Sequence, residues 1–298
     1  MTRTCLPPNA DYMKVDMTIP AGACDSHVHI FGPFAQFPLA DDRSYTPQEF
    51  SANQFIEHLN KIGFSRGVLV TASVCGTNNG SILRGLEEYP DRFRGVVVPD
   101  ADVSDKELDR WHDLGVRGAR FNLLQIDGKP MYRNGVGLEV LQRLAPKFAE
   151  RGWHAQIWAH APDLPELAPK LLPLGLPLVV DHMGRMNTSH GINHPGFQFL
   201  CRLIGEGKGW VKISGADRIG TKEIGYQDVD PFAKALIAAN LDRVVWGTDW
   251  PHINYFDPVQ LPNDGDLVNL LSRWFSSPSQ IEKVLVSNPA NLYDFPKL

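Results

Sequence analysis

Short apolar segments rich in valine and isoleucine alternate along the chain with helix-length amphipathic segments. Apolar runs of roughly four to eight residues are typical of buried strands, and longer amphipathic runs are typical of helices. We predict strands over residues 23–31, 67–73, 93–98, 118–121, 154–160, 177–181, 210–213 and 244–248. We predict helices over residues 47–62, 79–89, 105–114, 138–151, 197–205, 231–239, 266–275 and 278–286.

The regular alternation of strand and helix indicates parallel βαβ units. Eight such units in 298 residues favour a (β/α)8 barrel, an α/β fold that routinely spans this length as one domain. A doubly wound sheet is the competing fold, but no GxGxxG follows the first strand. The first and last strands also end in polar residues that must converge, and barrel closure places those two strands side by side. We therefore predict an N-terminal arm over residues 1–20 and one barrel domain over residues 21–298.

Histidine and aspartate side chains stand where several predicted strands give way to loops. His27 and His29 end the first strand, and because side chains two positions apart point to one face, they share a direction. His182 follows the sixth strand and Asp249 ends the eighth. Active sites of barrel enzymes lie at the carboxyl ends of the strands. The pattern therefore predicts one site built from both ends of the chain.

These four side chains are compatible with two kinds of chemistry. Neutral imidazoles and a carboxylate are suitable ligands for zinc, so His27, His29, His182 and Asp249 could hold one divalent metal ion. Without a metal, the imidazoles could donate hydrogen bonds to a carbonyl oxygen on which negative charge develops, while Asp249 takes a proton from water. Both mechanisms use the same residue types, so the spacing leaves the need for a metal open.

The composition narrows the choice of partner and compartment. The formal net charge is −5 and no Lys/Arg block occurs, so a nucleic-acid partner lacks an electrostatic basis. The four cysteines are widely spaced, as is typical of reduced thiols, and residues 1–20 lack the apolar core of a signal peptide. No apolar run has the length of about 18 residues that a membrane span needs. We expect a cytoplasmic protein that acts as a monomer or a small homo-oligomer.

Three segments resemble motifs of a known enzyme superfamily. They read Asp-Ser-His-Val-His-Ile-Phe-Gly-Pro over residues 25–33, Asp-His-Met-Gly-Arg over 181–185 and Trp-Gly-Thr-Asp-Trp-Pro-His over 246–252. In this order and spacing they resemble the amidohydrolase superfamily, and most closely its branch of lactonases acting on 2-pyrone-4,6-dicarboxylate. The resemblance extends from about residue 20 to the C-terminus and includes Ala-Gln-Phe-Pro over 35–38 and Gly-Thr-Asn-Asn over 76–79.

The resemblance implies a (β/α)8 barrel that hydrolyses a small anionic lactone in aromatic compound degradation. By the same resemblance, His27, His29 and His182 polarise the lactone carbonyl and Asp249 activates water. The pyrone lactonases are considered metal-independent, whereas many relatives use zinc, and hydrolysis of 4-sulfomuconolactone in the same branch is associated with zinc. A zinc-dependent decarboxylase of an aromatic or muconate-type acid is the alternative, because it uses the same His-x-His, His and Asp set.

An anionic substrate calls for arginine, whose planar guanidinium matches a carboxylate or sulfonate with two hydrogen bonds. Arg120 at the end of the fourth strand and Arg218 after the seventh resemble carboxylate-binding arginines of the family. Ser73 and Tyr45 resemble further polar contacts of the family, and the other side chains that we predict to contact the substrate are Trp158, His160 and His252. His252 could instead orient Asp249.

Two regions depart from the pattern of the branch. Pyrone lactonases carry a further Arg six residues beyond the carboxylate-binding Arg of the fourth strand. This chain has Ile126 there, and Arg133 or Lys129 could take its place. On the fifth strand Trp158 replaces a substrate-contacting Tyr, and His160 could be a metal ligand, a substrate contact or a packed residue. These departures affect the choice of lactone and leave the hydrolytic residues unchanged.

The remaining polar residues of interest are expected to lie outside the reacting group. Asp181 is expected to hydrogen-bond around the site rather than react. His154 begins the fifth strand, too far from its carboxyl end to reach the others. The histidines that we interpret as surface residues are His58, His112, His190 and His194.

Overall fold

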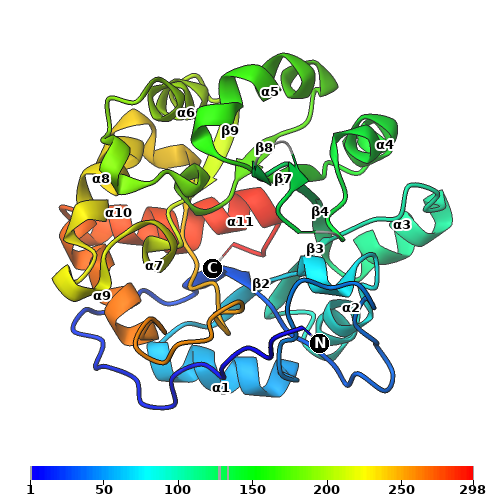
Figure 1. Cartoon of the computed structure of the whole chain (residues 1–298), viewed down its shortest axis with the longest axis horizontal. Helices are drawn as coiled ribbons and strands as arrows, with labels where there is room; N and C mark the ends of the chain where they lie inside the picture. Colours follow the sequence, from blue (N-terminus) through cyan, green and yellow to red (C-terminus); the bar gives the residue numbers. More distant parts are fainter. Residues whose placement is uncertain (1, 127–128, 133, 298) are drawn as a thin grey trace.

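The computed structural model describes residues 2–126, 129–132 and 134–297, and in it eight parallel strands form one sheet surrounded by helices (Figure 1). In their order around the sheet, the strands are β1 (Cys24–Val28), β2 (Arg66–Val70), β3 (Phe93–Val97), β4 (Val116–Asn122), β7 (His154–Trp158), β8 (Leu178–Val180), β9 (Gly209–Lys212) and β10 (Val244–Val245). The predicted (β/α)8 barrel is confirmed.

The α-helices follow the strands in the expected alternation. They are α1 (Ala52–Ile62), α2 (Gly80–Glu88), α3 (Asp105–Asp113), α4 (Leu138–Glu150), α5 (Leu164–Leu171), α6 (Pro195–Gly205), α7 (Ala216–Ile219), α8 (Asp230–Ala239), α9 (Asp264–Trp274), α10 (Pro278–Glu282) and α11 (Asn288–Tyr293). The predictions did not include α5, which contains a proline, or the short helices α7 and α11. Among the described residues, no helix has the length and apolar character that crossing a bilayer requires.

Helix α1 shows how local sequence sets an element and its packing. The Ser51 side chain accepts a hydrogen bond from the Gln54 backbone, and the Gln54 side chain accepts one from the Ser51 backbone. This capping box satisfies backbone N–H groups that the first turn leaves unpaired. Gly63 ends the helix in the left-handed region at φ 81°, where glycine carries no steric penalty. The buried face of the helix, which includes Phe55, packs toward the barrel.

The barrel closes through hydrogen bonds between β1 and the chain that follows β10. The Ser26 amide donates to the Trp246 carbonyl over 2.9 Å, and the His29 amide donates to the Trp250 carbonyl over 2.8 Å. The Asp249 amide donates to the His27 carbonyl over 2.9 Å. The first and last strands are therefore neighbours, as the prediction of a barrel requires, and the His-x-His segment lies beside Asp249.

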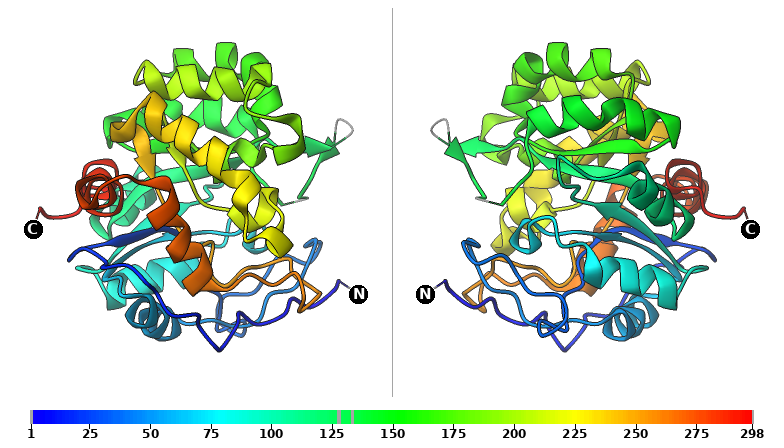
Figure 2. Two further views of the ribbon diagram at one scale, coloured as in Figure 1. Left: turned by 90° about the vertical axis from the view of Figure 1, so that its left-hand side faces the viewer. Right: turned by 90° about the vertical axis from the view of Figure 1, so that its right-hand side faces the viewer.

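The two ends of the barrel differ in what covers them. Figure 2 shows α11 at one end and the hairpin formed by β5 (Gln125–Ile126) and β6 (Lys129–Pro130) at the other. Tyr293 and Phe295 from the C-terminal segment pack against apolar strand residues, which include Val68 and Val96. The C-terminal segment therefore seals the end of the barrel at which the strands begin.

At the end of the barrel where the strands finish, the N-terminal arm forms hydrogen bonds with two loops. The Cys5 amide donates to the Thr46 carbonyl over 2.8 Å, and the Thr46 amide donates to the Arg3 carbonyl over 2.9 Å. The next residue, Leu6, donates to the Tyr255 carbonyl over 3.0 Å. The arm therefore joins the loop after β1 to the loop after β10. The boundary at residue 20 stays a prediction.

Gly247 marks the closest approach of the two terminal strand segments. A Cβ atom at this position would lie 2.5 Å from the His27 amide nitrogen and 2.8 Å from Asp25 Oδ1. We predict that Gly247→Ala destabilises the fold by about 1–3 kcal/mol, because neither the backbone nor the buried carboxylate can move away. Chemical denaturation of the variant measures the loss. Gly137→Ala is the matched control, because nothing lies within 4 Å of its added Cβ atom; equal stability of the two variants would contradict the prediction.

Candidate functional site

The four side chains predicted to carry chemistry meet at the carboxyl ends of β1, β8 and β10. Asp249 Oδ1 lies 3.4 Å from Nε2 of His29, 3.7 Å from Nε2 of His27 and 4.0 Å from Nε2 of His182. The His27 and His182 rings are 4.6 Å apart between centroids. One carboxylate oxygen thus faces three imidazole nitrogens.

Asp25 holds the backbone that presents this group. Its carboxylate accepts hydrogen bonds from the Thr248 amide over 3.0 Å, the Thr248 hydroxyl over 2.6 Å and the His27 amide over 3.2 Å. Asp249 and His182 have positive φ angles of 66° and 49°, an uncommon conformation for residues other than glycine. Such a strained backbone conformation persists only where contacts with the surrounding structure hold it in place. The buried carboxylate of Asp25 is such a contact for the loop that carries Asp249.

An ion pair dominates the electrostatics of Asp249. Arg218 donates to Asp249 Oδ2 from Nη2 over 2.8 Å and from Nε over 3.1 Å. Burial raises the pKa of Asp249, but Arg218 and the surrounding imidazoles outweigh burial and hold that pKa well below the usual carboxyl range. The carboxylate is therefore ionised, and Oδ1 is the oxygen left facing the imidazoles.

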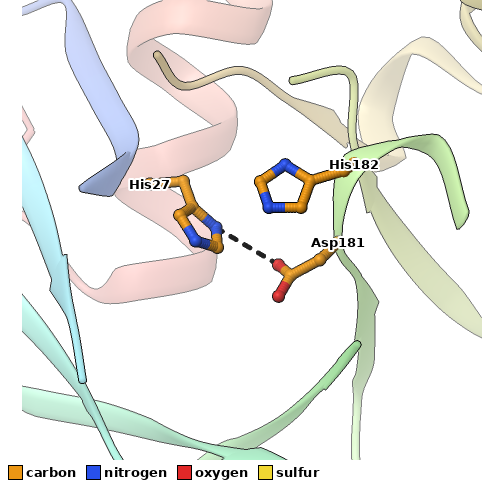
Figure 3. Close-up of side chains that lie close together, drawn as sticks. All are labelled: His27, Asp181 and His182. Atoms are coloured by element: carbon orange, nitrogen blue, oxygen red, sulfur yellow. Dashed lines mark ion pairs between the residues drawn. The ribbon is translucent and has the colours of Figure 1, made fainter. Parts of the chain in front are cut away.

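Asp181 anchors a second buried group, in which its carboxylate pairs with His27 beside His182 (Figure 3). Its Oδ1 lies 3.3 Å from His27 Nδ1 and 3.6 Å from Lys212 Nζ, and its Oδ2 accepts from Arg120 and Gln156, each over 3.1 Å. Burial raises the pKa of Asp181, but its nitrogen partners together hold that pKa well below the usual range. The role expected for Asp181, hydrogen bonding around the site, agrees with these contacts.

The hydrogen bonds of the three imidazoles differ. His29 Nδ1 lies 2.7 Å from the Val70 carbonyl oxygen, which can only accept, so this nitrogen carries a proton. His182 Nδ1 lies 2.9 Å from the Ser214 hydroxyl, which can donate or accept. Burial lowers the pKa of His182 to about 4, and burial together with Lys212 holds the pKa of His27 well below its usual value. His27 and His182 are therefore neutral near pH 7.

A pocket opens above Asp249. Its walls are His29, Tyr45, Ser73, Arg120, Tyr132, Trp158, His182, Arg185, Arg218, Asp249, Ile253 and Asn254. Three arginines and a single carboxylate make the lining net positive. The Tyr132 and Trp158 rings stack with centroids 4.8 Å apart and planes 4° from parallel. Such a pocket suits a small anionic compound with a flat apolar part.

Most of the predicted substrate contacts lie on this pocket. The structure places Arg120, Arg218, Ser73, Tyr45 and Trp158 in its walls. The Tyr45 hydroxyl is buried and has no hydrogen-bond partner among the described residues. It is therefore available to a bound molecule. That these side chains bind substrate stays a prediction.

Three predicted site residues lie away from the pocket walls. His27 is fully buried and does not line the pocket. His252 is also fully buried, and its Nε2 pairs with Asp264 over 2.8 Å. His160 is half-buried at the start of the turn after β7, outside the pocket lining. The structure thus brings neither His160 nor His252 to the pocket.

The sequence suggests that Lys129 or Arg133 replaces the arginine that pyrone lactonases carry at the position of Ile126. The structure does not support this role for Lys129. Lys129 is exposed and absent from the pocket lining. Arg133 and the side chain of Ile126 lie outside the described residues.

The interpretation of His58 as a surface residue is wrong. Its ring is buried, with Nε2 3.8 Å from Asp25 Oδ2 and Nδ1 3.8 Å from Asp264 Oδ2. The ring stacks against Phe55, one turn earlier on α1. Residues three apart share a helix face, so the apolar Phe55 was the signal that His58 faces inward.

Four pocket residues (Tyr132, Arg185, Ile253 and Asn254) and one buried cation were missed from sequence. Arg185 and Tyr132 line the pocket, and Arg185 makes no ion pair with any residue that the structure describes. Arg185 ends the Asp-His-Met-Gly-Arg motif, so the motif itself was the available signal. Lys212 is fully buried at the end of β9. Its position two residues after the inward-facing Trp210 was the only indication that it points into the barrel.

The predicted metal ligands fit a divalent ion by type and spacing but not by hydrogen bonding. Two sets each bring three ligand atoms within 4.8 Å of one another, namely His27, Asp181 and His182, and His27, His29 and Asp249. A metal-binding histidine donates its other ring N–H to an acceptor. His29 does so, but the Nδ1 of His27 lies 3.1 Å from Lys212 Nζ, which has no lone pair to offer. Since His27 belongs to both sets, neither set fits a metal as a whole.

Comparisons with known proteins agree with this architecture. A family model described as amidohydrolase matches residues 24–295. The 4-sulfomuconolactone hydrolase of Rhizobium radiobacter is 36% identical over 291 residues, which cover 97% of this chain and 95% of that protein. The 2-pyrone-4,6-dicarboxylate hydrolase of Comamonas testosteroni is 36% identical over 295 residues, which cover 95% of this chain and 94% of that protein. The crystal structure of a candidate 2-pyrone-4,6-dicarboxylic acid hydrolase from Pseudomonas putida matches with a TM-score of 0.79 at 33% identity, covering 94% of this chain and 100% of that one.

Proposed function

Because the chain belongs to the amidohydrolase family, we propose that it is a carboxylic-ester hydrolase that opens a small anionic lactone in aromatic compound degradation. The observation that carries this proposal is Asp249, an ionised carboxylate ringed by three imidazoles at the base of a pocket with three arginines. The relatives named as hydrolases of 2-pyrone-4,6-dicarboxylate and 4-sulfomuconolactone support the same reaction. The cytoplasmic location and the oligomeric state stay predictions.

Asp249 acts as the general base. Its Oδ1 accepts a proton from a water molecule, whose oxygen attacks the lactone carbonyl carbon. His29 helps to place that water, because its Nδ1 proton is committed to Val70 and its Nε2, 3.4 Å from Asp249 Oδ1, serves as an acceptor. Water can donate one hydrogen to each of these acceptors. The expected role of His29, donation to the carbonyl oxygen, would instead need a proton on Nε2 and stays a prediction.

His182 stabilises the negative charge that develops on the carbonyl oxygen. It lies in the pocket wall, and when the Ser214 hydroxyl donates to its Nδ1, its Nε2–H points toward the pocket. Collapse of the tetrahedral intermediate breaks the bond between the carbonyl carbon and the ring oxygen. The proton held by Asp249 passes to that leaving oxygen, which regenerates the carboxylate.

The pocket arginines hold the anionic groups of the substrate. Arg185 has no ion-pair partner among the described residues, and Arg120 uses only Nε on Asp181, so both retain donors for a carboxylate or sulfonate. Arg218 is engaged with Asp249. A substrate anion that shares Arg218 would weaken that ion pair and make Asp249 a stronger base at the moment of reaction.

The direct test is hydrolysis of 2-pyrone-4,6-dicarboxylate and 4-sulfomuconolactone, followed by ultraviolet absorbance. We expect turnover of at least one of the two lactones. Asp249→Asn should lower kcat by about 100-fold or more, because a general base contributes on that order. Circular dichroism of the variant controls for its fold.

Two outcomes would count against the proposal. Appreciable hydrolysis by a folded Asp249→Asn variant would exclude Asp249 as the base. Release of carbon dioxide without ring opening, on an aromatic or muconate-type acid, would support the zinc-dependent decarboxylase instead.

Arg185 provides a test of substrate binding. Arg185→Met should raise KM for the hydrolysed lactone by about 10-fold or more, because a hydrogen bond between charged groups contributes about 1.5–3 kcal/mol. The effect on kcat should be smaller. Steady-state kinetics measure both values, and Arg202→Met on the exposed face of α6 is the control. Equal KM values for the two variants would show that Arg185 does not bind the anion.

The ion pair between Asp249 and Arg218 predicts how kcat/KM falls at low pH. Because the pKa of Asp249 is held well below the usual carboxyl range, the base stays ionised as pH falls through about 4. The value of kcat/KM should therefore decline only below that range, and Arg218→Met should move the decline to higher pH. Initial rates across pH, with the fold monitored at each point, measure the limb. A wild-type limb near pH 6 would be inconsistent with this arrangement.

A further inference from the structure

Lys212 is a buried cation whose surroundings give it a defined task. Its side chain ends β9 inside the barrel and is fully buried. Lysine is almost never fully buried unless it is paired, because removing the charge from water is costly. The carboxylate of Asp181, with Oδ1 3.6 Å from Lys212 Nζ, favours the charged ammonium. The ammonium has three N–H groups, and each needs an acceptor.

Three acceptors surround the ammonium. Lys212 Nζ lies 2.9 Å from the Ser26 carbonyl oxygen, 2.7 Å from Gln156 Oε1 and 3.1 Å from His27 Nδ1. An ammonium group has three N–H donors, so these acceptors use all of them. The amide of Gln156 is oriented by both neighbours, because its Nε2 donates to Asp181 Oδ2 while its Oε1 faces Lys212.

The rival partner for His27 Nδ1 is Asp181. Its Oδ1 lies 3.3 Å away, longer than the 3.1 Å to Lys212 Nζ, and this oxygen accepts no hydrogen bond from any described residue. The well-formed contact of His27 Nδ1 is therefore the one with Lys212. A nitrogen that accepts from an ammonium carries no proton.

We propose that Lys212 is a positioning residue that fixes the tautomer of His27, leaving Nδ1 as an acceptor and Nε2–H as a donor aimed at Asp249. In a neutral imidazole one nitrogen donates and the other accepts. His27 Nε2 is buried, has no hydrogen-bond partner among the described residues and lies 3.7 Å from Asp249 Oδ1. At 3.7 Å this N–H makes no hydrogen bond with Asp249, so it acts on the ionised carboxylate through its electrostatic attraction.

The two histidines of the His-x-His segment then carry opposite tautomers. His29 holds its proton on Nδ1, bound to the Val70 carbonyl, and in the proposed mechanism uses Nε2 as an acceptor. His27 holds its proton on Nε2 and cannot offer that nitrogen to a metal ion. Lys212 thus converts a motif with the residue types of a metal site into one donor and one acceptor around Asp249. The kinetic consequence rests on the proposed function, whereas the tautomer does not.

Nitrogen NMR of protein labelled with 15N-histidine tests the proposal directly, because protonated and unprotonated ring nitrogens have well-separated shifts. His27→Gln and His29→Gln spectra assign the signals. In the wild type we expect a protonated Nε2 and a bare Nδ1 for His27, with the reverse for His29. A protonated Nδ1 in wild-type His27 would overturn the proposal, and this measurement needs no substitution of Lys212.

Lys212→Met should move the His27 proton to Nδ1, where Asp181 Oδ1 can accept it. Nε2 would then present a lone pair to the Asp249 carboxylate, so the base should lose its orientation. Lys208→Met, which changes an exposed lysine just before β9, should leave both tautomers unchanged. A folded Lys212→Met variant with an unmoved proton would refute the role of the ammonium.

The same substitution should change zinc affinity. With Nδ1 protonated toward a carboxylate, His27 gains the arrangement of a metal-binding histidine, and such outer contacts alter affinity by about 10- to 100-fold. Equilibrium dialysis against zinc chloride, with metal content measured afterwards, should show tighter binding by Lys212→Met than by the wild type. Equal or weaker binding by the variant would contradict the inference.

Kinetics separate this inference from the proposed function. For a lactone that the wild type hydrolyses, Lys212→Met should lower kcat by about 100-fold, the loss expected when a reacting group is displaced, while KM changes less. If no lactone is hydrolysed but the His27 and His29 tautomers are as described, the proposed function fails and the tautomer assignment stands. If a lactone is hydrolysed but His27 Nδ1 is protonated, the proposed function stands and the tautomer assignment fails.

Discussion

The carboxylate of Asp25 joins the first strand to the chain that follows the last one. It accepts from the Thr248 amide and hydroxyl and from the His27 amide, and all of these groups are buried. Leaving such groups unpaired away from water would cost about 1–3 kcal/mol each, so the junction has little freedom to move. The position of Asp249 relative to His27 follows from it, because Asp249 is the residue directly after Thr248. The barrel closure and the candidate site therefore depend on the same contact.

The charged side chains inside the barrel form two groups. In one group Asp181 is neighboured by Lys212 and Arg120, and in the other Asp249 pairs with Arg218. Each carboxylate is kept ionised by its own cations, so neither needs a proton from the other. The arginines also form part of the pocket wall, which leaves that wall net positive toward an incoming anion. The weakly negative whole chain, with a net charge of −5, therefore presents a local site of the opposite sign.

The two histidines of the His-x-His segment are the same residue type but have different hydrogen-bonding roles. His27 and His29 come from one short strand and point to one face, yet Lys212 contacts the ring of His27 and a backbone carbonyl contacts the ring of His29. A donor on one ring and an acceptor on the other impose different protonation. Motifs that identify a superfamily therefore leave the chemistry of each ring to its neighbours from other strands.

The sequence by itself determined the barrel and the meeting of His27, His29, His182 and Asp249, because apolar runs, strand alternation and strand-end motifs are local features. Only the tertiary structure decided that His58 and His252 pair with Asp264, and that Arg185 faces the pocket. It alone also revealed Lys212 beneath His27. A lysine or histidine can lie at the surface or inside, and the outcome depends on acceptors far away in sequence. For Lys212 these acceptors come from β1 and β7, which precede it by 186 and 56 residues and which barrel closure brings together.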